Sequence, residues 1–189
     1  MLYRFSITVC YSLFKIFFRL KISGQEAFSC KKPFILASNH LSYLDPPVLA
    51  VCLPCKITFL AKEELFRKPL AAWYFKDVGV IPIKRGKNDI SNTRLALKTL
   101  KTKPLLIFPQ GTRGASLDEA SSGVGFLCKR AKVPVIAAKI SGTDQVLPKG
   151  ARSLSCGRIE VIFKPVEGIN QSDSYEDITK KVVATIKSL

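Results

Sequence analysis

Short runs of apolar and β-branched residues alternate along the chain with longer stretches whose apolar residues recur at helical spacing. The runs typical of strands cover residues 34–37, 57–61, 80–83, 105–108, 135–140 and 159–163. The stretches typical of helices cover residues 46–52, 63–66 with 71–75, 89–101, 122–132 and 174–187. Strands that alternate with helices indicate an α/β fold, because each helix carries the chain back across one face of the sheet. We therefore expect a layered αβα domain with a mixed, mainly parallel sheet, preceded by an N-terminal amphipathic helix.

The first 20 residues combine a broad apolar surface with charges that are all positive. On a helix, at about 100° per residue, the cations share one arc and the large apolar side chains occupy the opposite side. The longest uncharged run, residues 5–14, is half the length of about 20 residues that a membrane-spanning helix needs. No signal-peptide cleavage pattern follows it. This segment is therefore predicted to be an amphipathic helix that neither spans a membrane nor is cleaved off as a signal peptide.

Two interpretations of this helix remain open. In the first, the helix docks on the domain's own core. In the second, it lies in a membrane interface, which accounts better for its broad, Phe-rich apolar face and for its stripe of cations. We favour the membrane interface, and we divide the chain into an interface helix over residues 1–22 and a domain over residues 23–189. The side chains assigned to the membrane are Phe5, Leu13, Phe17, Arg4, Lys15 and Arg19.

The charge balance narrows the choice of partner. The 189 residues include 30 Lys and Arg against 14 Asp and Glu, a formal net charge of +16. Such a surplus favours nucleic acid, an anionic membrane or a phosphorylated substrate. Nucleic acid is the least favoured, because the aromatic residues are not interleaved with cations and no helix-turn-helix or zinc-ligand pattern occurs.

Six cysteines are too few for a small disulfide scaffold, so we expect buried, reduced thiols in a cytosolic protein. Cys52 and Cys55 have the spacing of a redox C-x-x-C motif, but they follow an apolar helical run instead of opening a helix. We interpret both as packing residues. No partner histidine accompanies them, and we expect no metal site.

Polar clusters follow three of the predicted strands, where ligands bind in open α/β sheets. The first cluster contains His40, the only histidine, and hence the natural candidate for a base near neutral pH. Asp45 is predicted to be the N-cap of the helix that Pro46 begins, in a turn that folds its carboxylate back to the imidazole. Such a carboxylate orients the ring and stabilises the imidazolium. When the motif is taken alone, a satisfied core histidine explains it better, and a simple helix cap explains Asp45 equally well.

The second and third clusters offer groups that suit an anion. Lys84 and Arg85 directly follow the strand at 80–83, and a guanidinium binds phosphate bidentately. In the third cluster, Gly111 lets the backbone approach a ligand, while Thr112 and Arg113 offer a hydroxyl and a second guanidinium. The alternative for the second cluster is a pair of solvated loop charges, and the alternative for the third is a tight surface turn.

Together these clusters resemble the glycerolipid acyltransferase family, specifically the bacterial 1-acylglycerol-3-phosphate acyltransferases. Residues 39–45 match the N-H-x-S-x-x-D box, and residues 79–85 are similar to the G-x-I-x-I-x-R box. Residues 108–114 resemble the F-P-E-G-T-R box, and residues 133–135 the proline-containing fourth box. Four boxes in the family's order make chance agreement improbable. Gln110 departs from the family, because it stands in place of the glutamate of the third box.

The resemblance implies an O-acyltransferase that moves a fatty acyl group from a thioester to the sn-2 hydroxyl of 1-acylglycerol-3-phosphate, giving phosphatidic acid for phospholipid synthesis. His40 is then the general base and Asp45 orients it. The thioester is already activated, so no metal, cofactor or covalent acyl-enzyme is expected. The resemblance assigns the acceptor's phosphate to Arg85, Arg113, Thr112 and Lys84. It assigns positioning of the acceptor to Gln110, Gly111, Asn39 and Ser42.

The expected partners are lysophosphatidic acid, a thioester of acyl carrier protein or coenzyme A, and an anionic membrane, with no nucleic acid. The expected location is the cytoplasmic face of the cell membrane, as a peripheral, monotopic protein. Three alternatives stay open: another lysolipid or a sugar-lipid as acceptor, a lipid-binding homologue weakened in catalysis by Gln110, and, remotely, a nucleic-acid-binding protein.

Overall fold

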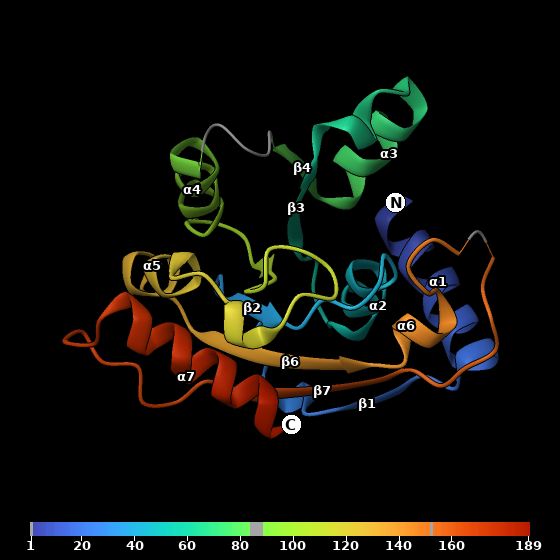
Figure 1. Cartoon of the computed structure of the whole chain (residues 1–189). Coiled ribbons are helices and arrows are strands. Elements are labelled where there is room, and N and C mark those ends of the chain that lie inside the picture. Colours follow the sequence, from blue (N-terminus) through green and yellow to red (C-terminus); the bar gives the residue numbers. More distant parts are fainter. Residues whose placement is uncertain (1, 84–88, 152) are drawn as a thin grey trace.

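The computed structural model describes residues 2–83, 89–151 and 153–189 (Figure 1). Its seven strands form one sheet in the order β1-β7-β6-β2-β5-β3-β4. Neighbouring strands run parallel except for the antiparallel pair β6 and β7, so the sheet is mixed and mainly parallel, as predicted. The strands are β1 (Lys21–Ser23), β2 (Ile35–Ser38), β3 (Thr58–Lys62), β4 (Val80–Ile83), β5 (Leu105–Ile107), β6 (Val135–Ser141) and β7 (Glu160–Pro165).

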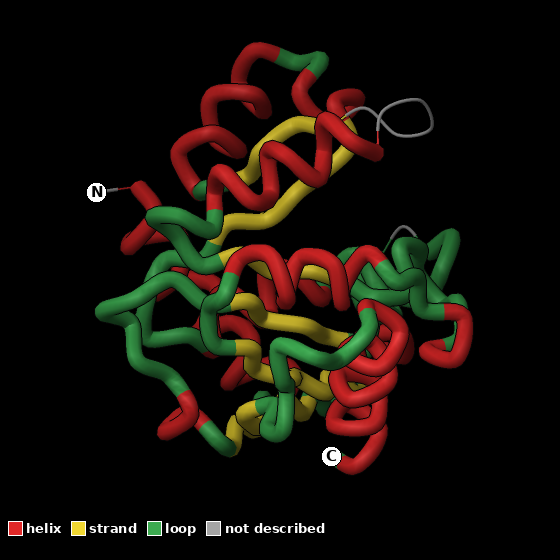
Figure 2. The backbone as a smooth tube through the Cα atoms, turned by 90° about the vertical axis from the view of Figure 1, so that its left-hand side faces the viewer, coloured by secondary structure: helices red, strands yellow, loops and turns green. Residues whose placement is uncertain are grey.

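Helices cover both faces of this sheet and confirm the layered α/β fold. The helices are α1 (Leu2–Phe18), α2 (Asp45–Cys52), α3 (Pro69–Val78), α4 (Asp89–Thr99), α5 (Gly123–Ala131), α6 (Thr143–Val146) and α7 (Tyr175–Ser188). Three 3₁₀ turns add η1 (Gln25–Ala27), η2 (Glu63–Phe66) and η3 (Leu117–Glu119). In both views β3 and β4 rise from the rest of the sheet, with α3 at the top of the molecule (Figures 1 and 2).

The alternation of side chains along β2 divides the core into two parts. Leu36 packs with residues of α1, α2 and β7 on one face of the sheet. Ile35 and Ala37 point to the other face, where they pack with residues of α4, α5 and α7. Because successive side chains of a strand point to opposite faces, a continuous apolar run such as β2 is what a strand buried on both faces requires.

Helix α1 has one apolar face in the core and another in solvent. Phe14 and Phe18 are buried, whereas Phe5, Ile16 and Phe17 are 68%, 71% and 62% exposed. The docked interpretation therefore accounts for only part of the apolar surface of α1. Within the described ranges, no helix is long and apolar enough to cross a membrane.

The division of the chain at residue 22 stays a prediction. Strand β1, which the sequence pattern does not predict, begins at Lys21 and pairs with β7, so the last two residues of the proposed segment join the sheet.

The expectation that all cysteines are reduced and buried is wrong. Cys30, before β2, and Cys55, after α2, form a disulfide, because the two loops bring their Cα atoms to 5.9 Å. Cys52 is therefore not the partner of Cys55. Cys52 and Cys128 do fit the expectation, since burial raises the pKa of each thiol to about 12. Cys156 is free but exposed.

Candidate active site

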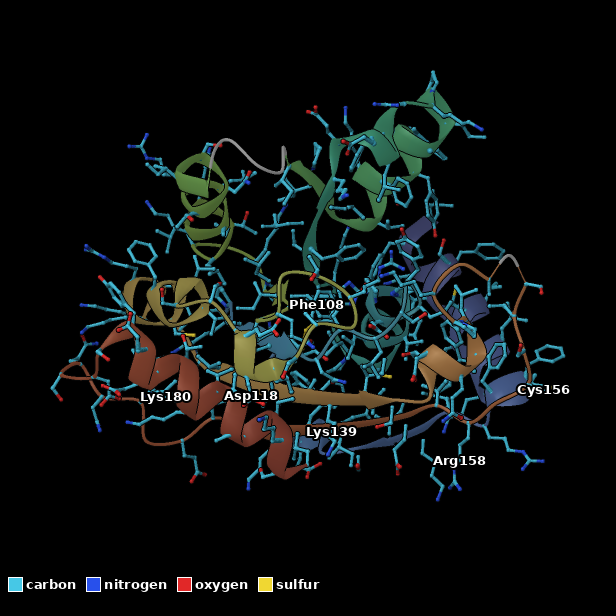
Figure 3. All side chains as sticks on the ribbon, viewed as in Figure 1. Phe108, Asp118, Lys139, Cys156, Arg158 and Lys180 are labelled. Carbon is cyan, nitrogen blue, oxygen red and sulfur yellow. A yellow bond between two sulfur atoms is a disulfide. The ribbon has the colours of Figure 1, made fainter. Side chains whose placement is uncertain are left out.

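The first and third polar clusters meet because the strands that precede them are neighbours. β2 pairs with β5 in parallel, so the loops after Ser38 and Ile107 leave the sheet side by side. The N–H of Gly114 donates to the carbonyl of His40 at 2.9 Å and joins the two loops. Figure 3 labels Phe108 near the centre of the molecule, where these loops lie.

His40 and Asp45 form a hydrogen-bonded pair in which Asp45 is fully buried and His40 is partly buried. Nδ1 of His40 lies 2.7 Å from Oδ2 of Asp45, and the side chains are 13% and 0% exposed. The same oxygen accepts the N–H groups of Leu41 at 2.6 Å and Ser42 at 2.8 Å. Because a carboxylate only accepts, it holds a proton on Nδ1 and leaves Nε2 for a substrate.

The prediction that Asp45 is the N-cap of α2 is wrong by one position. Leu44 is the capping residue, Asp45 is the first residue of the helix, and Pro46 follows it. The carboxylate of Asp45 still turns back to the preceding loop, where it accepts three bonds through one oxygen. The turn therefore serves both the helix start and the orientation of the imidazole.

The ring of His40 is also held by Phe108. The two rings stack with centroids 3.9 Å apart and planes inclined by 14°. Phe108 therefore restricts the imidazole on its face while Asp45 restricts it at its edge. Both constraints act on the same ring, and both come from residues within the predicted boxes.

Gln110 links the two loops through its amide. Its Oε1 accepts the backbone N–H of His40 at 2.7 Å, and its Nε2 donates to the carbonyl of Ala115. A carboxylate at this position would accept from His40, but would have no donor for Ala115. The departure from the family's glutamate therefore fits its surroundings. Positioning of an acceptor by Gln110 stays a prediction.

Four hydrogen bonds tie the first box to β6 and to the segment that follows it. The amide of Asn39 exchanges two bonds of 2.8 Å with the backbone of Ile140, and the hydroxyl of Ser42 donates to the carbonyl of Leu147 at 2.9 Å. The fourth bond joins Thr143 to Asp45. Asn39 and Ser42 are buried and satisfied within the protein, so the structure shows them holding the loop, and their contact with an acceptor stays a prediction.

Sequence reasoning missed Thr143. Gly142 precedes it with φ +83, and a Cβ at Gly142 would lie 1.9 Å from the carbonyl oxygen of Arg158, so only glycine fits this turn. The available signal was the sequence Ser-Gly-Thr directly after the predicted strand at 135–140, at the same edge of the sheet as the other clusters.

A cavity of about 630 Å³ opens beside the His40–Asp45 pair. Its polar end includes His40, Thr112, Arg113 and Lys149. The rest of its wall is mostly apolar and comes from α1, α2, β3, η2 and α3. The residues that make this wall include Ile7, Cys10, Pro47, Val51, Phe59, Leu65, Tyr74, Phe75 and Val78.

Arg113 is held at this cavity by an aromatic ring of the opposite loop. Its guanidinium carbon lies 3.2 Å from the ring centroid of Tyr43, which is 68% exposed. The sequence did not single out Tyr43, although an aromatic inside the first box was a usable signal. Gly111 and Thr112 also line the cavity beside Arg113.

Lys84 and Arg85 lie outside the described residues. The strand before them ends at Ile83, which pairs with Lys62 of β3, and Lys62 itself lines the cavity. Within residues 2–83, 89–151 and 153–189, no three side chains of His, Cys, Asp or Glu are grouped as metal ligands would be.

These features belong to a known class of protein. The chain matches the Acyltransferase family model over residues 19–141, and it is a member of that family. A solved structure of the 1-acyl-sn-glycerophosphate acyltransferase of Thermotoga maritima has the same fold, with a TM-score of 0.76 over 98% of this chain and 78% of that one, at 23% identity.

Two curated relatives show the range of named activities. A lyso-ornithine lipid O-acyltransferase of Pseudomonas aeruginosa is 32% identical, over 80% of this chain and 64% of the relative. A 1-acyl-sn-glycerol-3-phosphate acyltransferase of Bacillus subtilis is 27% identical, over 73% of this chain and 72% of the relative. The chain spans only 45% to 64% of the length of the first four curated relatives that it matches.

Proposed function

We propose that the protein transfers a fatty acyl group from a thioester to the sn-2 hydroxyl of 1-acylglycerol-3-phosphate, giving phosphatidic acid. The observation that carries this proposal is the His40–Asp45 pair at the polar end of a largely apolar cavity. Relatives that are named for this activity support the choice of 1-acylglycerol-3-phosphate as the acceptor. The donor is a thioester of acyl carrier protein or coenzyme A.

The proposed mechanism uses His40 as base and then as acid. Nε2 takes the proton of the sn-2 hydroxyl while the hydroxyl oxygen attacks the thioester carbonyl. The buried carboxylate of Asp45 stabilises the imidazolium that forms. When the tetrahedral intermediate collapses, the C–S bond breaks and the leaving thiolate takes the proton from His40. The base is then neutral again, and the protein itself forms no covalent intermediate.

The polar end of the cavity suits the acceptor's phosphate. Arg113 and Thr112 lie on the same cavity as His40, so a phosphate bound there places the glycerol hydroxyls near Nε2. We assign Arg85 and Lys84 to the same phosphate. The apolar wall from α1, α2, β3, η2 and α3 suits a fatty acyl chain, because burial of its apolar surface away from water is favourable.

We further propose that α1 binds the membrane peripherally, at its cytoplasmic face. Phe5, Leu13 and Phe17 are exposed and apolar, and α1 carries no acidic residue. The cations Arg4, Lys15 and Arg19 are exposed as well and suit anionic headgroups.

A second candidate function is acylation of lyso-ornithine lipid. It is favoured by the 32% identity to the Pseudomonas aeruginosa enzyme that is named for this substrate. A homologue without turnover is less favoured, because Gln110 completes two hydrogen bonds that keep the His40 loop in place.

A panel of acceptors and donors tests these proposals. Purified protein is incubated with lysophosphatidic acid, lyso-ornithine lipid and other lysolipids, each with acyl carrier protein or coenzyme A thioesters, and products are identified by mass. We expect phosphatidic acid as the main product. His40→Ala should lower kcat roughly 10²–10⁴-fold. A main product other than phosphatidic acid would reassign the acceptor, and a fully active His40→Ala would refute the mechanism.

A further inference from the structure

The elements η2 and α3 lie at the top of the molecule (Figure 1), and three of their large apolar side chains are exposed to solvent. Leu65 of η2 is 48% exposed, and Leu70 and Trp73 of α3 are 76% and 60% exposed. Leu70 and Trp73 are three residues apart, so they share one face of the helix. Large apolar side chains that gather on one exposed surface mark a site for a partner, whereas scattered ones do not.

The charges around these side chains favour a particular partner. The exposed cations Arg67 and Lys68 lie between Leu65 and Leu70 in the sequence, within the apolar group itself. The exposed acids of this region lie at its two ends, Glu63 and Glu64 before Leu65, and Asp77 near the end of α3. Tryptophan and leucine with adjacent cations are the residues that settle at the interface of an anionic bilayer.

The same elements line the cavity together with α1. Ile7 and Cys10 of α1 and Leu65 and Tyr74 of η2 and α3 lie on the cavity wall, and α1 contacts α3 directly. The two helices that enclose this part of the cavity therefore both carry exposed apolar side chains.

We propose that η2 and α3 form a second membrane-binding surface, defined by Leu65, Leu70 and Trp73, whose partner is an anionic lipid bilayer. The inference rests on the proposed function, in which α1 supplies the first contact. With both helices in the interface, the cavity wall between them adjoins lipid, and an acyl chain passes between bilayer and cavity without crossing water.

Trp73 reports on this surface without a label, because it is the only tryptophan of the chain. The full protein is mixed with vesicles of phosphatidylcholine, alone or with phosphatidylglycerol. Binding to the mixed vesicles should shift the emission of Trp73 to shorter wavelength, and lipids brominated on their acyl chains should quench it.

Matched variants separate this surface from α1. Leu70→Ser should weaken binding to phosphatidylglycerol vesicles roughly tenfold. Ile90→Ser changes a side chain of α4 that is 71% exposed, and it should leave binding unchanged. An equal loss of vesicle binding in both variants would overturn the proposal, because any exposed apolar side chain would then contribute to binding, whatever its place on the surface.

The outcomes also distinguish this inference from the proposed function. If the protein sediments with vesicles while the emission of Trp73 stays unshifted and unquenched, α1 binds lipid and this surface does not. If acyl carrier protein alone shifts the emission, the surface docks a protein, and the bilayer is the wrong partner. If the protein does not sediment at all, the proposed membrane contact of α1 fails together with this one.

Discussion

The hydroxyl of Thr143 donates to Oδ1 of Asp45 at 2.5 Å, and both side chains are fully buried. The other carboxylate oxygen accepts His40 and two backbone N–H groups, so Thr143 is the partner that fixes the remaining oxygen. A residue 98 positions further along the chain therefore orients the group that orients the base.

Replacing this hydroxyl should impair turnover more than binding. In Thr143→Val, Oδ1 of Asp45 loses its side-chain donor in a buried site, at a cost of about 1–3 kcal/mol, and the carboxylate is free to turn from His40. We expect kcat to fall about tenfold or more, with KM for the acceptor nearly unchanged, in steady-state assays. Thr143→Ser keeps the donor and should restore most of kcat. Equal losses in the two variants would show that Thr143 acts only through packing.

Both the oxygen and the nitrogen of the Gln110 side-chain amide should contribute to turnover or to stability. Gln110→Ala removes its bonds to His40 and Ala115, and we expect kcat to fall at least about tenfold because the base loses its fixed place. Gln110→Glu keeps the acceptor for His40 but loses the donor for Ala115. It should retain kcat within a few-fold and lower the free energy of unfolding by about 1 kcal/mol. Denaturant unfolding and kinetics on the same preparations measure both effects. A Gln110→Ala enzyme with unchanged kcat would contradict the bridging role.

The elements predicted well are those with a strong local signal. Each of the six predicted strands is present. The runs of β2, β5 and β6 are continuously apolar because these strands contribute side chains to the core on both faces of the sheet. β1 and α6 were missed, since elements of three and four residues carry too little periodicity to be recognised. The N-cap error at Asp45 is of the same kind, because a cap is decided by backbone angles that composition does not show.

The site was predictable where neighbouring strands bring together clusters that follow them. The approach of His40 to Asp45 follows from the turn before α2, and the approach of the third box to the first follows from the pairing of β2 with β5. Thr143, Tyr43 and the Cys30–Cys55 disulfide depend on contacts between distant segments. Such contacts depend on the complete tertiary packing, and no spacing within a single sequence reveals them.

Tyr43 should act on the acceptor through Arg113. A cation over an exposed aromatic ring is stabilised by about 0.5–1 kcal/mol. If this energy holds Arg113 in place for the acceptor's phosphate, it corresponds to roughly a two- to fivefold difference in affinity for the acceptor. Tyr43→Ala frees the guanidinium, so KM for lysophosphatidic acid should rise by that factor while kcat changes less. Tyr43→Phe keeps the ring and should behave like the parent protein. If KM rose as much in Tyr43→Phe as in Tyr43→Ala, the hydroxyl of Tyr43 and not its ring would be responsible for the effect on the acceptor.

The Cys30–Cys55 disulfide should stabilise the fold. It closes a loop with a sequence separation of 25, for which the restriction of the unfolded chain contributes about 3 kcal/mol. The Cys30→Ser variant should therefore unfold at lower denaturant than the parent protein under oxidising conditions. Cys156→Ser removes a free, exposed thiol and serves as the control. If reducing agent leaves the stability of the parent unchanged, the bond contributes nothing in solution.

The start of α7 should become less stable in acid. Ser174 and Asp177 form a capping box, and the hydrogen bonds that Asp177 accepts from the side chain and backbone of Ser174 lower the pKa of its carboxyl group. A carboxyl with a lowered pKa in the folded state contributes stability above its unfolded pKa, near 3.9, and this contribution is lost as the pH falls through the folded value. Asp177→Asn should therefore lower Tm at neutral pH, and the difference from the parent should shrink below about pH 4. Because hydrogen bonds cause most of the shift, added salt should change this difference little. A difference that stays constant down to the most acidic pH tested would mean that the charge of Asp177 does not stabilise α7.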